Sequence, residues 1–272
     1  MSSRSDPNRR AAILEAQRLL QRVAVPSGWT PVSRAPTQEL DTPSSTPGTT
    51  NLVDLYQWWT APGPWSAVLS FIDAHPPPGS TGNGRGTTGQ AGTLVASSVS
   101  DGFPTSGSRF DSRQILFEVS PMPDGAAGIR IDVQVVWYPT RPLAERVPAG
   151  ATKVVATVVR PTSLTDFSPE VLATATYTTP SVVARLAGKV DSLPLALPGA
   201  KSCPGDTGMD PQLRLTFSGP PSVPVVVVHD DPNGCGSVTF SRGTKGEPAL
   251  TDDGLLPEVE VLLDLSPSQL LP

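Results

Sequence analysis

Residues 129–137 constrain the fold of this chain most strongly, because apolar and polar side chains alternate along them. One face carries Ile129, Ile131, Val133, Val135 and Trp137, and the other carries Arg130, Asp132 and Gln134. A period of two indicates a β-strand, since successive side chains in a strand point to opposite faces. We therefore expect one buried face and one face in water, which is typical of an antiparallel sheet.

Other segments extend this pattern into sheets and helices. Strands are expected at 51–59, 93–99, 114–120, 129–138, 152–160, 171–177, 212–218, 223–229 and 236–240. Asp124-Gly125 lies at the tip of a predicted hairpin between two of these strands. Helices are expected at 11–24, after Pro64, from Pro180 and at about 255–264, and proline suits the first turn of a helix.

The order of these elements predicts an α+β fold. We expect two β-α-β-β-type units with antiparallel or mixed sheets, each packed on a helix started by proline, and an N-terminal helix before them. The expected domains are 1–50 (N-terminal helix and Pro/Thr/Ser linker), 51–160 and 168–265. Because the two units share a plan of elements, an internal repeat is a hypothesis.

Proline and glycine are frequent, at 32 and 24 residues, and they gather in the predicted connections. Residues 33–50 are read as a linker. Residues 79–92 are read as a mobile loop, since they offer little to bury. Gly84-Arg85-Gly86-Thr87-Thr88-Gly89 has the spacing of a dinucleotide-binding loop, but the strand before it and the helix after it are missing from the pattern.

Charge and hydropathy narrow the classes of partner. The net charge is −5, and no dense cluster of Lys or Arg is present, which argues against a nucleic-acid partner. No stretch approaches the roughly 20 apolar residues of a transmembrane helix. The first ten residues are polar and lack the apolar core of a signal peptide.

Cys203 and Cys235 are the only cysteines, and both lie in turn-rich segments beside predicted strands. A bridge would close a loop of about 32 residues and stabilise the fold by roughly 3–4 kcal/mol. It would also indicate an oxidising compartment. The alternatives are free thiols in a cytoplasmic protein, or a zinc site with His229, which would still lack a fourth ligand.

Several motifs resemble a family of uncharacterised secreted proteins and lipoproteins of actinobacteria. They are Ser202-Cys203-Pro204-Gly205-Asp206-Thr207-Gly208, Gly234-Cys235-Gly236-Ser237-Val238 and Val135-Val136-Trp137-Tyr138-Pro139-Thr140-Arg141-Pro142. The resemblance spans roughly 50–265. It implies an export signal or anchor, a bridge between the two cysteines and no known activity. Since this chain shows no export segment, we expect the native start to lie upstream of Met1.

Candidate binding residues come from two places. Trp58 and Trp59 are adjacent on a predicted strand, so one of them should face away from the core, where it could stack on a sugar or anchor a partner; Tyr138 belongs to the same aromatic-rich half. His229, Asp230 and Asp231 follow an apolar run and offer either a His–carboxylate pair or a simple turn.

These observations favour an extracytoplasmic, non-enzymatic binding or structural module of unknown ligand in the cell envelope. No residue is assigned a catalytic role, and no cofactor or metal is expected. The alternative is an envelope hydrolase that uses a His–Asp pair at His229 or His75. His75 follows Asp73 at the end of a predicted helix, where it would also serve as a cap.

Overall fold

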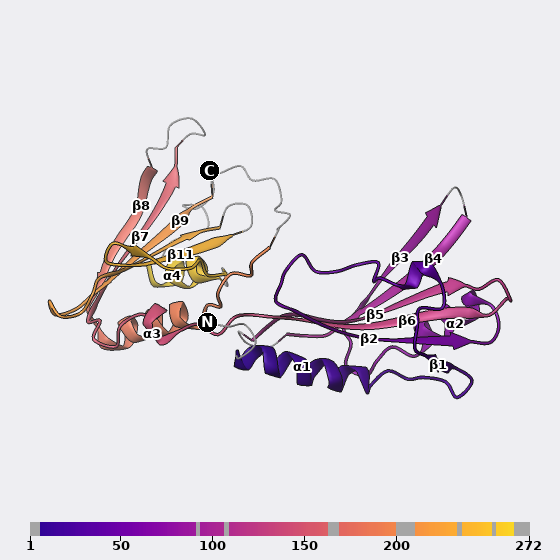
Figure 1. Cartoon of the computed structure of the whole chain (residues 1–272). Helices are drawn as coiled ribbons and strands as arrows, with labels where there is room; N and C mark the ends of the chain where they lie inside the picture. Colours follow the sequence, from indigo (N-terminus) through magenta and orange to yellow (C-terminus); the bar gives the residue numbers. More distant parts are fainter. Residues whose placement is uncertain are drawn as a thin grey trace. The chain divides into compact units, whose positions relative to one another are not determined.

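The chain folds as two units, Met1–Pro139 and Thr140–Pro272, and each contains a six-stranded antiparallel sheet (Figure 1). The computed structural model describes residues 6–90, 93–105, 109–162, 169–199, 210–232, 236–251 and 254–263. No helix in these ranges is both long and apolar enough to cross a membrane. The predicted α+β class with an N-terminal helix is confirmed.

Sheet A belongs to the first unit. Its strands are β1 (Thr30–Val32), β2 (Leu52–Ala61), β3 (Asn83–Gln90), β4 (Thr93–Gly102), β5 (Phe110–Pro121) and β6 (Ala127–Trp137), in the order β1-β2-β6-β5-β4-β3. The hairpin between β5 and β6 turns at Gly125, whose φ of +82° favours glycine. Strand β6 therefore lies at the centre of the sheet, between β2 and β5.

Two helices cover one face of sheet A. Helix α1 (Pro7–Leu20) begins at a cap in which Asp6 accepts the Asn8 N–H at 2.8 Å, and α2 (Trp65–Ala74) follows Pro64. Their buried residues are Ala12, Ala16, Leu19, Val68 and Ile72, which pack on the apolar face of β6 and on β5. Glu15 of α1 also forms an ion pair with Arg113 of β5 at 2.7 Å. The core of the first unit lies between these two helices and sheet A.

A segment of irregular chain covers the opposite face of sheet A. We call residues 33–50 the strap; it includes the short 3-10 helix η2 (Gln38–Leu40). Leu40 is fully buried, and every residue of β6 is buried on both faces. The expectation that Arg130, Asp132 and Gln134 face water is therefore wrong, because the segment predicted to be a linker packs over them.

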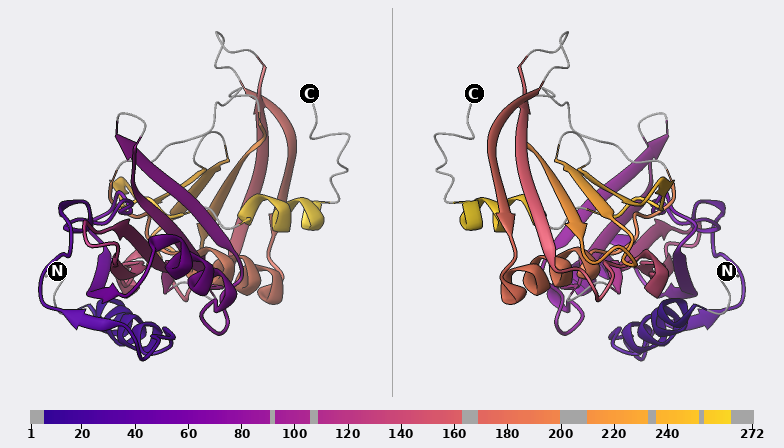
Figure 2. Two further views of the ribbon diagram at one scale, coloured as in Figure 1. Left: turned by 90° about the vertical axis from the view of Figure 1, so that its right-hand side faces the viewer. Right: turned by 90° about the vertical axis from the view of Figure 1, so that its left-hand side faces the viewer.

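Sheet B belongs to the second unit. Its strands are β7 (Lys153–Pro161), β8 (Pro169–Tyr177), β9 (Gln212–Ser218), β10 (Val226–Asp231), β11 (Ser237–Arg242) and β12 (Lys245–Gly246), in the order β12-β11-β10-β9-β7-β8. The short 3-10 helix η3 (Leu143–Glu145) precedes them. Strands β7 and β8 curve together as a pair (Figure 2).

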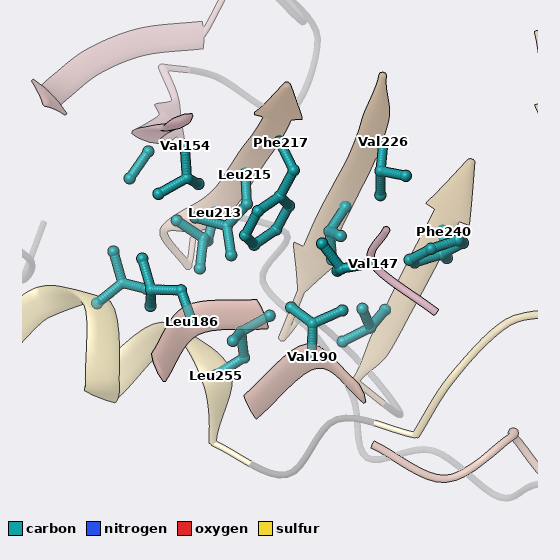
Figure 3. Packing of buried hydrophobic residues seen from close by; sticks show 14 of the residues in the cluster. Val147, Val154, Leu186, Val190, Leu213, Leu215, Phe217, Val226, Phe240 and Leu255 are labelled. Atoms are coloured by element: carbon teal, nitrogen blue, oxygen red, sulfur yellow. The ribbon is translucent and has the colours of Figure 1, made fainter. Parts of the chain in front are cut away.

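Helices α3 (Pro180–Ser192) and α4 (Leu255–Leu263) supply the rest of the second core. Val183, Leu186 and Val190 form the buried stripe of α3, as their spacing predicts. They meet apolar side chains from the strands, among them Leu215 and Phe217 (Figure 3).

Three features differ from the sequence-based expectations. We expected the first unit to run from 51 to 160 after a separate segment 1–50, and the second unit to cover 168–265. In the structure α1 and the strap belong to the first unit, and β7 belongs to the second, because it pairs with β8 and β9. Residues 83–90 form the edge strand β3 and not a loop, since the backbone of β4 provides a partner that glycine-rich sequence patterns do not reveal.

The shared order of elements does not extend to the order of strands. After α2 the chain enters β3, at the far edge of sheet A, and returns strand by strand to β6 beside β2. After α3 the chain enters β9 beside β7 and moves outward to β12. The two sheets are thus wound differently.

A substitution at Gly128 can test how closely the strap packs on β6. A Cβ atom at this position would lie 2.8 Å from Cβ of Pro36 and 3.1 Å from Cδ1 of Leu40. We expect Gly128→Ala to lower the free energy of unfolding by about 1–3 kcal/mol through overpacking. Urea titration gives this value, with Gly102→Ala as the control, since nothing lies within 4 Å of a Cβ there. Equal losses in both variants would contradict close packing of the strap.

Candidate functional site

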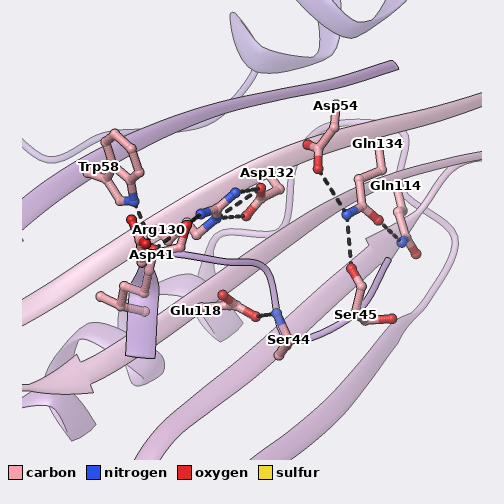
Figure 4. A network of polar contacts seen from close by, with 11 residues as sticks. Asp41, Ser44, Ser45, Asp54, Trp58, Gln114, Glu118, Arg130, Asp132 and Gln134 are labelled. Atoms are coloured by element: carbon pink, nitrogen blue, oxygen red, sulfur yellow. Dashed lines mark hydrogen bonds and ion pairs between the residues drawn. The ribbon is translucent and has the colours of Figure 1, made fainter. Parts of the chain in front are cut away.

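A buried ion pair lies at the centre of the strap-covered face of sheet A (Figure 4). Nε and Nη2 of Arg130 donate to the two carboxylate oxygens of Asp132 at 2.8 and 2.7 Å. The two side chains are 3% and 0% exposed. Both belong to β6 and are two residues apart, so the strand places them on the same face.

The same guanidinium holds the backbone of the strap. Nη1 of Arg130 donates to the carbonyl oxygens of Leu40 and Asp41 at 3.2 and 2.6 Å. The indole nitrogen of Trp58 donates to the Leu40 carbonyl at 2.9 Å. One arginine and one tryptophan of sheet A thus satisfy carbonyl groups that an irregular segment leaves without a partner of its own.

Further along the strap, polar side chains of β5 and β6 repeat this role. The Glu118 carboxylate accepts the Ser44 N–H, and Nε2 of Gln134 donates to the Ser45 carbonyl at 2.9 Å. Gln134 also donates to Oδ2 of Asp54 at 3.4 Å and accepts from Gln114 at 2.7 Å. The face that we predicted to be wet is an anchoring surface for the strap.

Negative charge exceeds positive charge on this face, because one arginine lies among three carboxyl groups. Burial raises the pKa of Asp54 to about 6, and the neighbouring Asp132 carboxylate adds to the effect. Burial also raises the pKa of Glu118. Among the residues that the structure describes, no group of three or more His, Cys, Asp or Glu side chains is arranged to hold a metal ion.

An open groove of about 430 Å³ lies between the strap and Trp58. The strap side is lined by Ser33, Arg34, Ala35, Pro36, Thr37, Gln38 and Asp41. On the sheet side, Trp58 is half-buried, with its nitrogen directed at the strap (Figure 4). Tyr56 lies two residues away on the same face of β2 and is 49% exposed.

The two aromatic rings are fixed by their neighbours. Tyr56 and Trp58 meet edge to face, with centroids 4.8 Å apart and planes at 60°. The Arg130 guanidinium lies 4.6 Å from the Tyr56 ring centre and 5.8 Å from that of Trp58, so it contributes cation–π attraction to both. We call the groove between Trp58 and the lining residues of the strap, together with the adjacent Tyr56, the aromatic groove.

The other aromatic candidates have structural roles. Trp59 packs against the core on the helix-covered face, as expected for the neighbour of an outward Trp58. Tyr138 is 9% exposed, and its hydroxyl donates to Asp111 at 2.7 Å. Trp58 and Trp59 thus lie on opposite faces of β2, and Trp58 is the member that lines a groove.

His229, Asp230 and Asp231 are divided between the two faces of sheet B. Asp230 is fully buried, and its Oδ2 accepts the Leu256 N–H of α4 at 3.1 Å. His229 and Asp231 are half-buried and alternate with Asp230 along β10, so they lie on the opposite face. The structure therefore does not bring His229 and Asp230 together as a pair.

His75 caps α2. Its Nδ1 lies 2.8 Å from the Phe71 carbonyl oxygen, and its ring stacks on Phe71 with centroids 4.1 Å apart. Asp73 forms an ion pair with Arg85 of β3 at 2.7 Å. The capping interpretation of His75 agrees with these contacts.

A second hollow, of about 520 Å³, runs along α3 in the second unit. Its lining comes from one side of α3, from 147–152 and from Thr178, and most of these side chains are small and apolar. The one charged residue in the lining is Asp191, whose Oδ1 already accepts the Val147 N–H at 2.8 Å. The aromatic groove is chemically the richer of the two hollows.

Sequence reasoning missed Arg130, Asp132, Tyr56, Arg34 and Asp41. Opposite charges two residues apart on a strand that is otherwise strongly apolar were the available signal for Arg130 and Asp132. For Arg34 and Asp41 no signal exists in the local pattern, because a Pro/Thr/Ser segment looks the same whether it packs or not.

Comparisons of the chain with protein-family models, with curated proteins and with solved structures find no match.

Asp54 makes stability depend on pH. Its pKa in the folded state, about 6, exceeds the ordinary 3.8, so its stabilising contribution is complete below about pH 4 and is lost as the pH rises through about 6. Asp54→Asn removes the titration. We expect the free energy of unfolding of the variant, relative to that of wild type, to rise by about 1–2 kcal/mol as the pH increases from about 4.5 to about 8. Urea unfolding at each pH measures this difference.

Asp124→Asn is the matched control, since Asp124 is exposed at the tip of the β5–β6 hairpin. A difference between Asp54→Asn and wild type that stays constant across this pH range would show that Asp54 has no raised pKa.

Proposed function

We propose that this protein is an extracytoplasmic, non-enzymatic binding module whose ligand contacts the aromatic groove. The observation that carries the proposal is the position of Trp58 and Tyr56. Tyr56 is the one aromatic residue among the large hydrophobic side chains that are exposed in the described part of the chain. Exposed aromatic rings in a rigid setting are typical anchors of binding surfaces.

The anchoring network behind the groove supports binding and gives no catalytic arrangement. Arg130 and Asp132 are buried and paired with each other, and Arg130 also binds the strap. The alternative, a hydrolase with a His–Asp pair, is not favoured by the contacts given for the described residues. His75 caps α2, and Asp230 binds the start of α4 from the face of β10 opposite to that of His229 and Asp231. We therefore propose binding alone.

The extracytoplasmic part of the proposal depends on Cys203 and Cys235, which lie outside the described residues. The ends of the neighbouring strands support a bridge. Strand β9, which follows Cys203, begins at Gln212, and Leu213 pairs with Asp230 near the end of β10. Cys235 belongs to the connection from β10 to β11. The start of β9 and the end of β10, the strand ends that follow Cys203 and precede Cys235 in the sequence, thus lie at the same end of sheet B.

The bridge is tested by the mass of the intact protein. After expression in an oxidising compartment and denaturation without reductant, we expect alkylation to add no label to either cysteine, and two labels to be added after reduction. A Cys203→Ser variant serves as a control, because it leaves Cys235 free to react. Two labels without reduction would overturn the bridge and, with it, the extracytoplasmic proposal.

Binding is tested by sedimentation with purified, insoluble cell-wall polymer. We expect the full-length protein to sediment with it and Trp58→Ala to bind at least about tenfold more weakly, since an aromatic anchor is lost. Trp58→Phe keeps a stacking ring and should still bind. Leu143→Ala, which removes an 80% exposed side chain in the other unit, is the control for non-specific adhesion.

Two results would overturn the proposal. Equal sedimentation of wild type and Trp58→Ala would show that the aromatic groove is not the binding surface. Release of soluble fragments from the polymer by wild type would show an enzyme and not a binding module.

A further inference from the structure

We propose that the aromatic groove binds a neutral oligosaccharide, with one sugar ring stacked on Trp58 and its hydroxyl groups bound by Arg34, Gln38 and Asp41. This inference rests on the proposed function and names the ligand class for the same site. A sugar ring has an apolar face of C–H groups and an edge of hydroxyl groups. A site for it needs an aromatic surface next to both donors and acceptors.

The groove has the size for such a ligand. Its volume of about 430 Å³ lies within the range of small-molecule sites, roughly 300–1,000 Å³. Trp58 forms the sheet side, and the strap forms the side that faces it. A sugar ring between them would therefore contact an aromatic side chain and polar side chains at once.

Three polar side chains in the lining are available to a ligand. Arg34, Gln38 and Asp41 are exposed. Within the described ranges, none of the three side chains makes a hydrogen bond or an ion pair, although the Asp41 backbone is held by Arg130. A guanidinium donates, a carboxylate accepts and an amide does both, so together they match hydroxyl groups, which donate and accept.

The balance of charge in the lining favours a neutral ligand. Arg34 and Asp41 are the charged residues that line the groove, and they cancel. An anionic ligand such as a phosphate or a uronic acid would face the Asp41 carboxylate, and a cationic ligand would face the Arg34 guanidinium. Neither sign of charge is selected, whereas a polyhydroxylated neutral molecule can use both side chains.

The aromatic surface is rigid before the ligand arrives. The Trp58 nitrogen is held by the Leu40 carbonyl at 2.9 Å, and Tyr56 supports the indole edge to face. Arg130 fixes both rings from within the buried network. Because little side-chain freedom remains to be lost on binding, a weak stacking contact can give measurable affinity.

A proline-rich peptide is the competing occupant, since aromatic grooves also bind such peptides. The lining favours a sugar. Trp58 lines the sheet side of the groove, and the opposite side carries Arg34, Gln38 and Asp41. A polyproline helix offers carbonyl acceptors to Arg34 and Gln38 but no donor to Asp41, because proline lacks the backbone N–H, whereas sugar hydroxyl groups can partner all three side chains.

The experiment is calorimetric titration of the full-length protein with named probes: cellotetraose, maltotetraose and chitotetraose as neutral oligosaccharides, a tetragalacturonate as the acidic one, and decaproline. We expect at least one neutral probe to bind and the acidic probe and decaproline to bind at least about tenfold more weakly. Trp58→Ala should weaken binding of the neutral probe at least about tenfold, and Trp58→Phe by less than about threefold.

Variants of the strap keep the inference testable if Trp58→Ala disturbs the fold. Arg34→Ala and Gln38→Ala change exposed side chains. Each should lower the affinity for the neutral probe by about threefold to tenfold, which corresponds to the loss of one hydrogen bond. Gln57→Ala is the matched control, because Gln57 is exposed and lies between Tyr56 and Trp58 on the other face of β2. It should bind as wild type does.

Failure of this inference and failure of the proposed function give different results. If no neutral probe binds while Trp58-dependent sedimentation with the wall polymer persists, the sugar assignment is overturned and the binding module stands. Tight binding of decaproline would also overturn the sugar assignment. If Trp58→Ala and wild type behave alike in both experiments, the site itself is wrong.

Discussion

The first unit depends on the ion pair of Arg130 and Asp132. A buried ion pair loses its hydration, and its own attraction seldom offsets that cost without further hydrogen bonds. Here the strap provides them, because the Leu40 and Asp41 carbonyls accept from the same guanidinium. Each element satisfies the hydrogen-bonding groups of the other. The irregular strap has carbonyl groups without partners, and the sheet has a buried donor that water does not reach.

This arrangement gives the strap two roles at once. Its inner side is bound to sheet A through Arg130, Glu118 and Gln134. Its outer side forms one wall of the aromatic groove, opposite Trp58. The binding surface is thus supported directly by the network beneath it.

Much of the fold could be predicted from the sequence, since periodicity reports burial on one face directly. The alternation of 129–137 gave the central strand, and Val183, Leu186 and Val190 gave the helix of the second unit. What covers the second face of a sheet is a non-local property. Hence Arg130 was assigned to water, and Gly84 and Gly86 were assigned to a loop although a neighbouring strand pairs with them. The site could be predicted only as far as Trp58.

The contacts that hold the strap also determine when the groove can form during folding. Arg130 lies 89 residues after Asp41, and Glu118 lies 74 residues after Ser44. Closing such long loops is slow compared with forming helices or the β5–β6 hairpin. On a ribosome the strap emerges first and must wait for β6, the last strand of its sheet. The groove can therefore form only after β6 has joined sheet A, which completes the first unit.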